Sequence, residues 1–287
     1  MDGALNWHVA RAMLEWQREM GVDEAIVDAP IDRYAQAAKA EAAAKLAKEQ
    51  AAQGRSVQNQ HAASPMPAPQ VDPVDVARQM AAAAADLPAL QAAMAAFPHC
   101  DLQRGARSLV FGDGIVGAPV MILGEAPGRD EDIQGKPFVG RAGQLLDRML
   151  AAIDRDRRAD DPAQGVYISN VLPWRPPQNR DPRPDEIAMM MPFVERHVLL
   201  VDPKVLIVMG NIACQAVLGK RGITRLRGTW HQALGRPALP MFHPAFLLRQ
   251  PHAKREAWAD LLALRAHLEQ PLASSQTPSS PSDQKAT

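Results

Sequence analysis

The stretch Val120–Leu146 constrains the fold more than any other part of the chain. It begins with the apolar run Val-Met-Ile-Leu, which stops at Gly-Glu-Ala-Pro-Gly, and this pattern predicts a buried strand that leaves a sheet through a tight loop. An acidic cluster and a single aromatic residue, Phe138, precede the helical apolar spacing that starts at Arg141. Because open α/β sheets bind ligands beyond the carboxyl ends of their strands, this loop predicts a site. The alternative is an ordinary connection between a strand and a helix.

Further apolar runs alternate with helical patterns along the chain. The expected strands are Pro119–Gly124, Val166–Val171, Val205–Met209 and Leu239–His243, and the expected helices are Arg141–Ile153, Pro184–Leu200, Asn211–Leu218 and Ala253–Leu268. Such alternation is typical of a parallel sheet covered on both faces. We therefore predict an α/β fold, a three-layer α/β/α sandwich with a central four-stranded, mainly parallel sheet plus N-terminal helices. Every expected strand ends on polar residues. Packing alone hardly explains polar groups at the same ends of four buried strands, so this pattern favours a functional site.

The composition changes along the chain and predicts four segments. Residues 1–53 are expected to form an N-terminal helical extension, and residues 54–73, rich in Gln, Ser, Ala and Pro, a disordered linker. Residues 74–270 are expected to form the main folded domain, which starts with a helix over Val74–Ala96. Residues 271–287, rich in Ser, Pro and Thr, are expected to form a disordered tail.

Charge and hydropathy limit the classes of partner. The 32 basic residues balance the 32 acidic ones, but residues 1–96 hold 8 basic and 12 acidic residues, and residues 97–270 hold 23 and 19. This small, arginine-rich excess permits a nucleic-acid partner. No apolar run approaches about 18 residues and no signal-peptide pattern opens the chain, so a cytoplasmic protein without a membrane partner is expected. Two cysteines cannot make a disulfide framework.

Four motifs, taken in order, carry a resemblance to a known family. They read GEAPGRDEDIQGKPFVGRAGQLLD, YISNVLPWRPPQNRDP, ITRLRGTWH and FHPAFLLRQP. They resemble the uracil-DNA glycosylase superfamily, and most of all its family 4, the iron–sulfur-containing bacterial and archaeal branch. The resemblance covers about Phe97–Leu268. It implies a monofunctional enzyme of base excision repair that flips uracil out of DNA and hydrolyses its N-glycosidic bond, associated with the bacterial nucleoid.

The resemblance also implies roles for individual residues. Breaking a glycosidic bond places positive charge on the sugar and negative charge on the departing base. By resemblance, Phe138 stacks on the flipped base, Asn170 reads its edge, and His243 donates to uracil O2. A carboxamide can donate to uracil O4 and accept from N3–H, whereas cytosine presents the opposite pattern. The structural alternatives are a core phenylalanine, an asparagine that caps a turn, and a structural histidine before proline.

Two glutamates compete for the role of catalytic carboxylate. Glu131 aligns with the glutamate that the family uses to activate water or to stabilise the sugar cation, and it is preferred. Glu125 lies in the same motif, beside Gly124, and both are assigned to substrate binding, where Glu125 can also shape the loop. A carboxylate can act through its field as well as by proton transfer.

The segment after His243 predicts contacts with DNA. Apolar residues there, Phe246, Leu247 and Leu248, can wedge into the base stack while Arg249 meets phosphate. Arg175 is assigned to the DNA backbone as well. Further loop arginines with the same expected role are Arg180, Arg225 and Arg227. For the apolar residues the alternative is simply the start of the last helix, and for Phe246 the two interpretations have about equal weight. For each single arginine the alternative is a solvated surface.

The sequence departs from the family pattern at the cysteine ligands of the iron–sulfur cluster. Family 4 holds an iron–sulfur cluster on four cysteines, and such clusters need that thiolate set. Only Cys100 remains here, because the other three positions hold Phe97, Trp174 and a methionine near Met190, while Cys214 matches no ligand position. We therefore predict no cluster, no metal and no other cofactor, with apolar side chains filling the volume.

Two other functional classes stay open. The chain can be a non-catalytic module that binds uracil-containing or abasic DNA, although the presence of Glu131, Asn170 and His243 argues against it. Alternatively, the N-terminal helices can make it a scaffold for a protein partner. The segment 175–183 lacks the basic, histidine-containing insertion of the covalently trapping relatives, which favours turnover. A monomer is expected.

Overall fold

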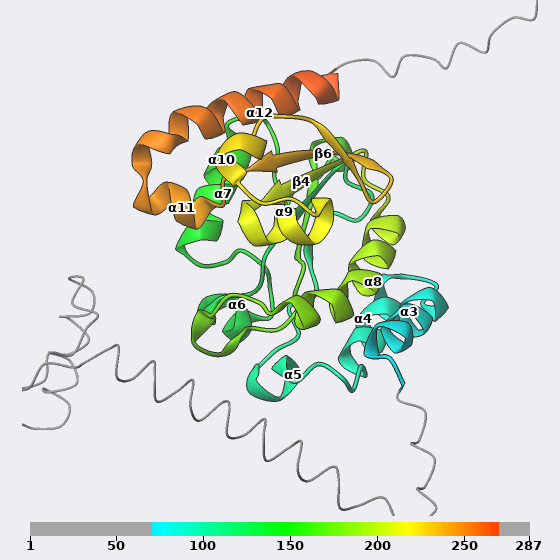
Figure 1. Ribbon diagram of the computed structural model, residues 1–287. Coiled ribbons are helices and arrows are strands. Elements are labelled where there is room, and N and C mark those ends of the chain that lie inside the picture. Colours follow the sequence, from blue (N-terminus) through cyan, green and yellow to red (C-terminus); the bar gives the residue numbers. More distant parts are fainter. Residues whose placement is uncertain (1–70, 270–287) are drawn as a thin grey trace, which may run out of the picture. The chain divides into compact units, whose positions relative to one another are not determined.

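The computed structural model describes residues 71–269 (Figure 1). The expectations for the extension 1–53, for the linker up to residue 70 and for the tail 271–287 lie outside the described residues. Asp72 caps the first described helix, α3 (Pro73–Ala83), because its Oδ1 accepts from the Val74 amide at 2.8 Å. No helix within this part of the chain combines the length and hydropathy needed to cross a bilayer.

The sheet confirms the four predicted strands and adds two. Its strands within residues 71–269 are β1 (Asp113–Gly114), β2 (Val120–Gly124), β3 (Val166–Asn170), β4 (Val205–Met209), β5 (His231–Ala233) and β6 (Arg236–Met241), in the order β1-β3-β2-β4-β6-β5. The four inner strands are parallel, and β1 and β5 pair antiparallel at the edges. The predicted count of four was wrong because β1 and β5 are short and lack an apolar run.

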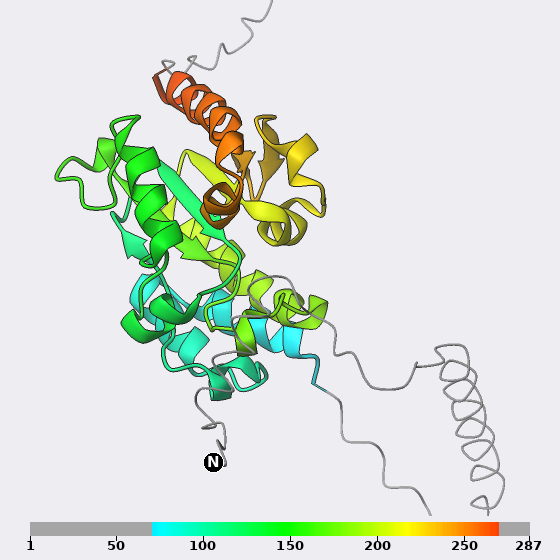
Figure 2. The same ribbon diagram turned by 90° about the vertical axis from the view of Figure 1, so that its left-hand side faces the viewer.

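Two pairs of helices cover the sheet, which confirms the α/β/α sandwich (Figures 1 and 2). On β2, Val120 and Ile122 face one core cluster and Met121 and Leu123 face the other, as alternation along a strand requires. The first face packs against α7 (Arg141–Ala151) and α12 (Lys254–Glu269). The second face packs against α8 (Pro184–Val201) and α9 (Gly210–Leu218).

Two helices replace the single helix expected over Val74–Ala96. They are α3 and α4 (Leu87–Ala95), and both pack on α8. The break comes at Asp86, whose Oδ1 accepts from the Ala89 amide at 2.8 Å and so starts a new helix. Arg196 on α8 donates to the Ala84 carbonyl, which ties the break to the sandwich.

Short helices fill the loops between these layers. They are α5 (Leu102–Gly105), α6 (Arg129–Gln134), α10 (Ile223–Leu226) and α11 (Pro244–Arg249), with single 3₁₀ turns at Pro162–Gln164, Pro177–Asn179 and Pro251–Ala253. Two of them follow parallel strands closely, α6 after β2 and α11 after β6. Their residues therefore lie at the edge where all four parallel strands end.

Candidate active site

A pocket lies at the carboxyl ends of the parallel strands. Its volume is about 730 Å³, and loops that follow β2, β3, β4 and β6 line it. The predicted site residues that line it are Glu125, Glu131, Phe138, Asn170, His243 and Arg249. The sheet thus brings together residues that are up to 124 positions apart in the sequence, counted from Glu125 to Arg249.

Gly124 lies behind the pocket wall, where two side chains close over it. A Cβ at this position would lie 2.3 Å from Asn170 Oδ1 and 2.6 Å from Phe138 Cε2, so any larger residue would displace both. The ring of Phe138 lies 5.4 Å from the ring of His243, centroid to centroid. Gly124 therefore shapes the pocket by its lack of a side chain, and is not among the residues that line it.

Asn170 ends strand β3 and is almost completely buried. Its carboxamide reaches the pocket and makes no hydrogen bond within the described residues, so it does not cap a turn there. A buried amide without an internal partner presents both a donor and an acceptor to a ligand. The geometry is therefore compatible with reading the polar edge of a base.

His243 precedes α11 as its N-cap and lines the pocket. Its Nδ1 accepts from the Ala245 amide at 3.1 Å, so the ring proton of the neutral form is on Nε2. Burial, assisted by the charge of Arg249 and opposed by that of Glu131, lowers the pKa of His243 to about 4. At neutral pH the side chain is thus an uncharged imidazole with one N–H to donate.

Glu131 on α6 is held by the backbone. Its Oε2 accepts from the Gly128 amide at 3.1 Å, and its Oε1 accepts from the amides of Val139 and Gly140 at 3.0 Å each. Three of the roughly four acceptor positions of a carboxylate are therefore used. Glu131 joins α6 to the loop that carries Phe138, and it still faces the pocket.

Glu125 stands in a different environment on the same pocket wall. Burial, together with the negative charge of Asp181, raises the pKa of its carboxyl group to about 7. No side-chain hydrogen bond to Glu125 is found among residues 71–269, in contrast to Glu131. Glu125 is therefore a carboxyl group that can exchange a proton near neutral pH.

Helix α11 turns one face toward the pocket. His243, Phe246 and Arg249 line the pocket at a spacing of three residues, which places them on one side of a helix. Leu247 points the other way and is fully buried against Leu145 and Phe242. The prediction that Leu247 contacts DNA is wrong for this conformation, and Phe246 has the suitable position instead.

Leu248 and the predicted loop arginines differ in their exposure and in whether they line the pocket. Leu248 is half-buried and does not line the pocket. Arg175 is half-buried with its Nε on Asn179 Oδ1 at 2.7 Å, whereas Arg180 lines the pocket. Arg225 is exposed.

Two of these arginines have carboxylate partners inside the fold. Arg180 is held by the buried Glu186, with its Nη1 on Oε2 at 2.9 Å and its Nη2 on Oε1 at 2.6 Å. Arg227 forms an ion pair with the buried Asp260 of α12 and lies over the ring of Phe242. The guanidinium of Arg227 is therefore used in packing α12, and its contact with the DNA backbone stays a prediction.

Some pocket residues were not predicted. Arg221 and Asp181 contribute charges to its rim from loops without a recognisable pattern. Asn211 follows β4, and its Oδ1 accepts from the Gly222 and Ile223 amides at 3.1 and 2.8 Å, which joins α9 to the next loop. The polar residue at the end of that strand was the only available signal.

The four positions that correspond to iron–sulfur ligands lie in one core cluster. Phe97, Cys100, Trp174 and Met190 are all buried there. Burial raises the pKa of the Cys100 thiol, so the single remaining cysteine is held as a thiol. Cys214 lies in the core between the sheet and α9. Within residues 71–269 no group of three His, Cys, Asp or Glu residues is placed to hold a metal, and the residues present do not fit an iron–sulfur cluster.

Fold and site define an α/β protein with a pocket of about 730 Å³ at the strand ends, which polar, charged and aromatic side chains line, and the family comparison agrees. Residues 111–262 match the family described as Uracil DNA glycosylase superfamily. The chain belongs to this superfamily, whose role is that of a uracil-DNA glycosylase in base excision repair.

Named relatives place it near one branch of that family. It is similar to the type-4 uracil-DNA glycosylase of Archaeoglobus fulgidus, with 38% identity over 170 residues that cover 56% of this chain and 82% of the relative. The type-4 enzyme of Sulfurisphaera tokodaii is 34% identical, with 58% and 77% covered. The type-4 enzyme of Thermotoga maritima is 37% identical, with 52% and 77% covered.

Proposed function

We propose that this chain is a monofunctional uracil-DNA glycosylase that flips uracil from DNA, hydrolyses its N-glycosidic bond and leaves an abasic site. The observation that carries the proposal is the convergence of His243, Phe138 and Asn170 on one pocket. An uncharged donor, a stacking ring and an unpaired amide are the groups that excision of a flipped base requires. The proposal includes a monomer that works on chromosomal DNA in the cytoplasm, at the nucleoid.

The reaction separates charge, and each of these residues has a role in that separation. The bond between C1′ of the sugar and N1 of uracil breaks, and its electron pair leaves with the base. The Nε2–H of His243 donates to uracil O2, where negative charge builds. A carboxylate stabilises the positive sugar, and a water molecule adds to C1′ and gives up a proton, which the uracil anion takes up. Because His243 is neutral at the start, its hydrogen bond strengthens only as the base becomes anionic.

The carboxylate is assigned to Glu131, as the resemblance implies. Three amides fix its orientation, which suits a group that acts through its field. Glu125 is the alternative, since its raised pKa suits proton exchange with the attacking water. The pH dependence of the rate distinguishes the two.

If Glu125 is the working carboxylate, the single-turnover excision rate should rise with pH and level off above about 7, and Glu125→Gln should abolish this rise. Asp181→Asn should move the inflection to lower pH, because the charge of Asp181 helps raise the pKa of Glu125. A rise that persists in Glu125→Gln would exclude it as the titrating group.

Thermal unfolding provides an independent check on the same pKa. The folded-state pKa of Glu125 lies above its ordinary value of 4.5, so the group contributes stability below pH 4.5 that is lost as pH rises through about 7. Glu125→Gln should therefore stabilise the protein more at pH 8 than at pH 5.

Affinity for DNA is assigned to arginines around the pocket. Arg249 is exposed on its wall and Arg180 lines it, while Arg175 lies in the same loop as Arg180. Phosphate contacts of this kind supply affinity without sequence choice, and they weaken as salt rises. Phe246, together with the half-buried Leu248, is the apolar group nearest to where a wedge would enter the base stack.

We further propose that the enzyme works without an iron–sulfur cluster or another cofactor. The purified protein should be colourless, with iron well below one atom per chain, and a chelator should leave its melting temperature unchanged. The reason is that Cys100 is the only thiol at a ligand position. Stoichiometric iron with a visible chromophore after anaerobic purification would contradict this prediction.

Excision assays with purified protein test the function directly. Uracil-containing oligonucleotides should yield abasic sites with multiple turnovers, and matched thymine and cytosine strands should not react. A non-catalytic binder, the second candidate, would bind the uracil strand and release no base. Deletion of residues 1–70 should leave excision intact if the N-terminal segment serves only a protein partner.

A further inference from the structure

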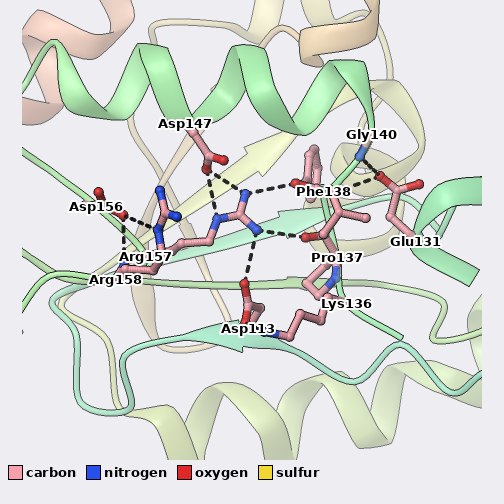
Figure 3. Close-up of polar contacts among 11 residues, drawn as sticks. Asp113, Glu131, Lys136, Pro137, Phe138, Gly140, Asp147, Asp156, Arg157 and Arg158 are labelled. Atoms are coloured by element: carbon pink, nitrogen blue, oxygen red, sulfur yellow. Dashed lines mark hydrogen bonds and ion pairs between the residues drawn. The ribbon is translucent and has the colours of Figure 1, made fainter. Parts of the chain in front are cut away.

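Arg157 is a buried cation that binds the backbone of the loop carrying Phe138, as Figure 3 shows. Its side chain is only 6% exposed. Its Nη1 donates to the Pro137 carbonyl at 2.9 Å, and its Nη2 donates to the Phe138 carbonyl at 3.0 Å. A charged group in this position must be paired to be tolerated.

The charge of Arg157 is balanced by two aspartates from different elements. Asp147 of α7 accepts from Nε at 2.9 Å and forms an ion pair with Nη2 at 2.7 Å, and Asp113 of β1 accepts from Nη1 at 3.3 Å. With the two carbonyls, the guanidinium makes four hydrogen bonds in addition to its ion pair with Asp147. A lysine, with a single ammonium, cannot reproduce this fork.

The residue that Arg157 holds has an unfavourable backbone. Phe138 has a φ of 53°, in the left-handed region, which costs roughly 1–3 kcal/mol for a residue other than glycine. Its carbonyl also packs on Gly143, where a Cβ would lie 1.8 Å from the oxygen. Such a conformation persists only where surrounding contacts hold it in place.

Two side chains of opposite charge hydrogen-bond to the backbone of the loop that carries Phe138. Arg157 binds the carbonyls of Pro137 and Phe138, and Glu131 binds the amides of the next two residues at 3.0 Å each (Figure 3). Between the two charged groups, the ring of Phe138 is set beside Gly124 and His243. Loss of the hydrogen bonds from either Arg157 or Glu131 would allow the Phe138 backbone to relax to an ordinary φ, which would move its ring.

The geometry points to Arg157 as a positioning residue for uracil excision, which acts by holding Phe138 in the conformation that stacks on the flipped base. This inference rests on the proposed function. Arg157 does not line the pocket, so it has no contact with the reacting atoms. Its contribution passes through the Phe138 backbone.

Substitution of Arg157 tests this role. Arg157→Gln should slow single-turnover excision by up to about 10²-fold, the loss that a misplacement of about 1 Å can cause. The excision rate of Arg157→Lys should lie between the rates of Arg157→Gln and the wild type. If Arg157→Gln does not fold, Arg157→Lys takes its place in every comparison. The matched control is Arg158→Gln, because Arg158 is 81% exposed and pairs with Asp156 at the surface; it should excise at the wild-type rate.

A double-mutant cycle separates positioning from general stability. In a Phe138→Ala background, Arg157→Gln should cost less than about 3-fold in rate, since the ring it positions is gone. Its effect on the melting temperature should persist in both backgrounds. Equal rate losses with and without the Phe138 ring would overturn the inference.

A structural readout keeps the test independent of the proposed function. The Cα chemical shift of Phe138 reports its φ, and it should leave the left-handed range in Arg157→Gln. An unchanged shift would overturn the positioning role whether or not the protein excises uracil. A wild-type protein that excises no uracil would instead overturn the proposed function, and the shift would still decide whether Arg157 positions Phe138.

Discussion

His243→Ala is expected to slow single-turnover uracil excision by about 10²–10³-fold, the range seen when one preorganised electrostatic group is removed. The Nε2–H of the neutral imidazole meets its strongest partner only when uracil O2 carries negative charge. An interaction realised only in the transition state changes the rate of the chemical step and leaves ground-state affinity nearly untouched. Binding of uracil-containing DNA should therefore stay within a few-fold of wild type.

The same substitution removes the N-cap of α11, so stability must be measured beside activity. Loss of the Nδ1 acceptor typically costs about 1 kcal/mol. His252→Ala is the matched control, because His252 is exposed and outside the pocket, and it should leave the rate unchanged. A His243→Ala protein that is folded and excises at the wild-type rate would remove His243 from the mechanism, and one that loses DNA binding would make its role positional.

Asn170→Asp is expected to reduce uracil excision by about 5- to 150-fold, the equivalent of roughly 1–3 kcal/mol for a buried polar group left unpaired. The change replaces the amide donor by an acceptor, so uracil O4 loses its partner and faces negative charge. Cytosine, which presents a donor at the corresponding position, should be penalised less. The ratio of uracil to cytosine excision should therefore fall.

A second asparagine provides the control for added charge near DNA. Asn179→Asp places the same carboxylate at the pocket rim, where Asn179 is exposed and contacts Arg175. It should weaken DNA binding slightly and leave base selection unchanged. If Asn179→Asp lowers excision as much as Asn170→Asp does, the effect is electrostatic repulsion of DNA and not recognition of the base.

The parallel strands were predictable because they are buried on both faces. Five consecutive buried residues in β2, and again in β4, leave a continuous apolar run that few other structures produce. The polar residues directly after such runs had to lie at one edge of the sheet. This is why Glu125, Asn170 and His243 could be placed together before the structure was known.

Residues whose partners are distant in the chain were not predictable. Leu247 and Phe246 are neighbours in a motif, but the packing of α11 on α7 decides that Leu247 is buried and Phe246 faces the pocket. Arg227 has the sequence context of a DNA contact, and its ion pair with Asp260 arises only because α12 lies beside it.

By itself, the sequence determined the family, the order of the parallel strands along the chain and the residue types of the pocket, because these depend on local patterns. The tertiary structure decided how those residues are held. Long-range contacts join Arg157 and Glu131 to the loop in which Phe138 has a left-handed backbone conformation. Long-range contacts also give Glu131 and Glu125 their different environments. The free energy of such contacts depends on distance and burial in the folded state, which no local run of residues encodes.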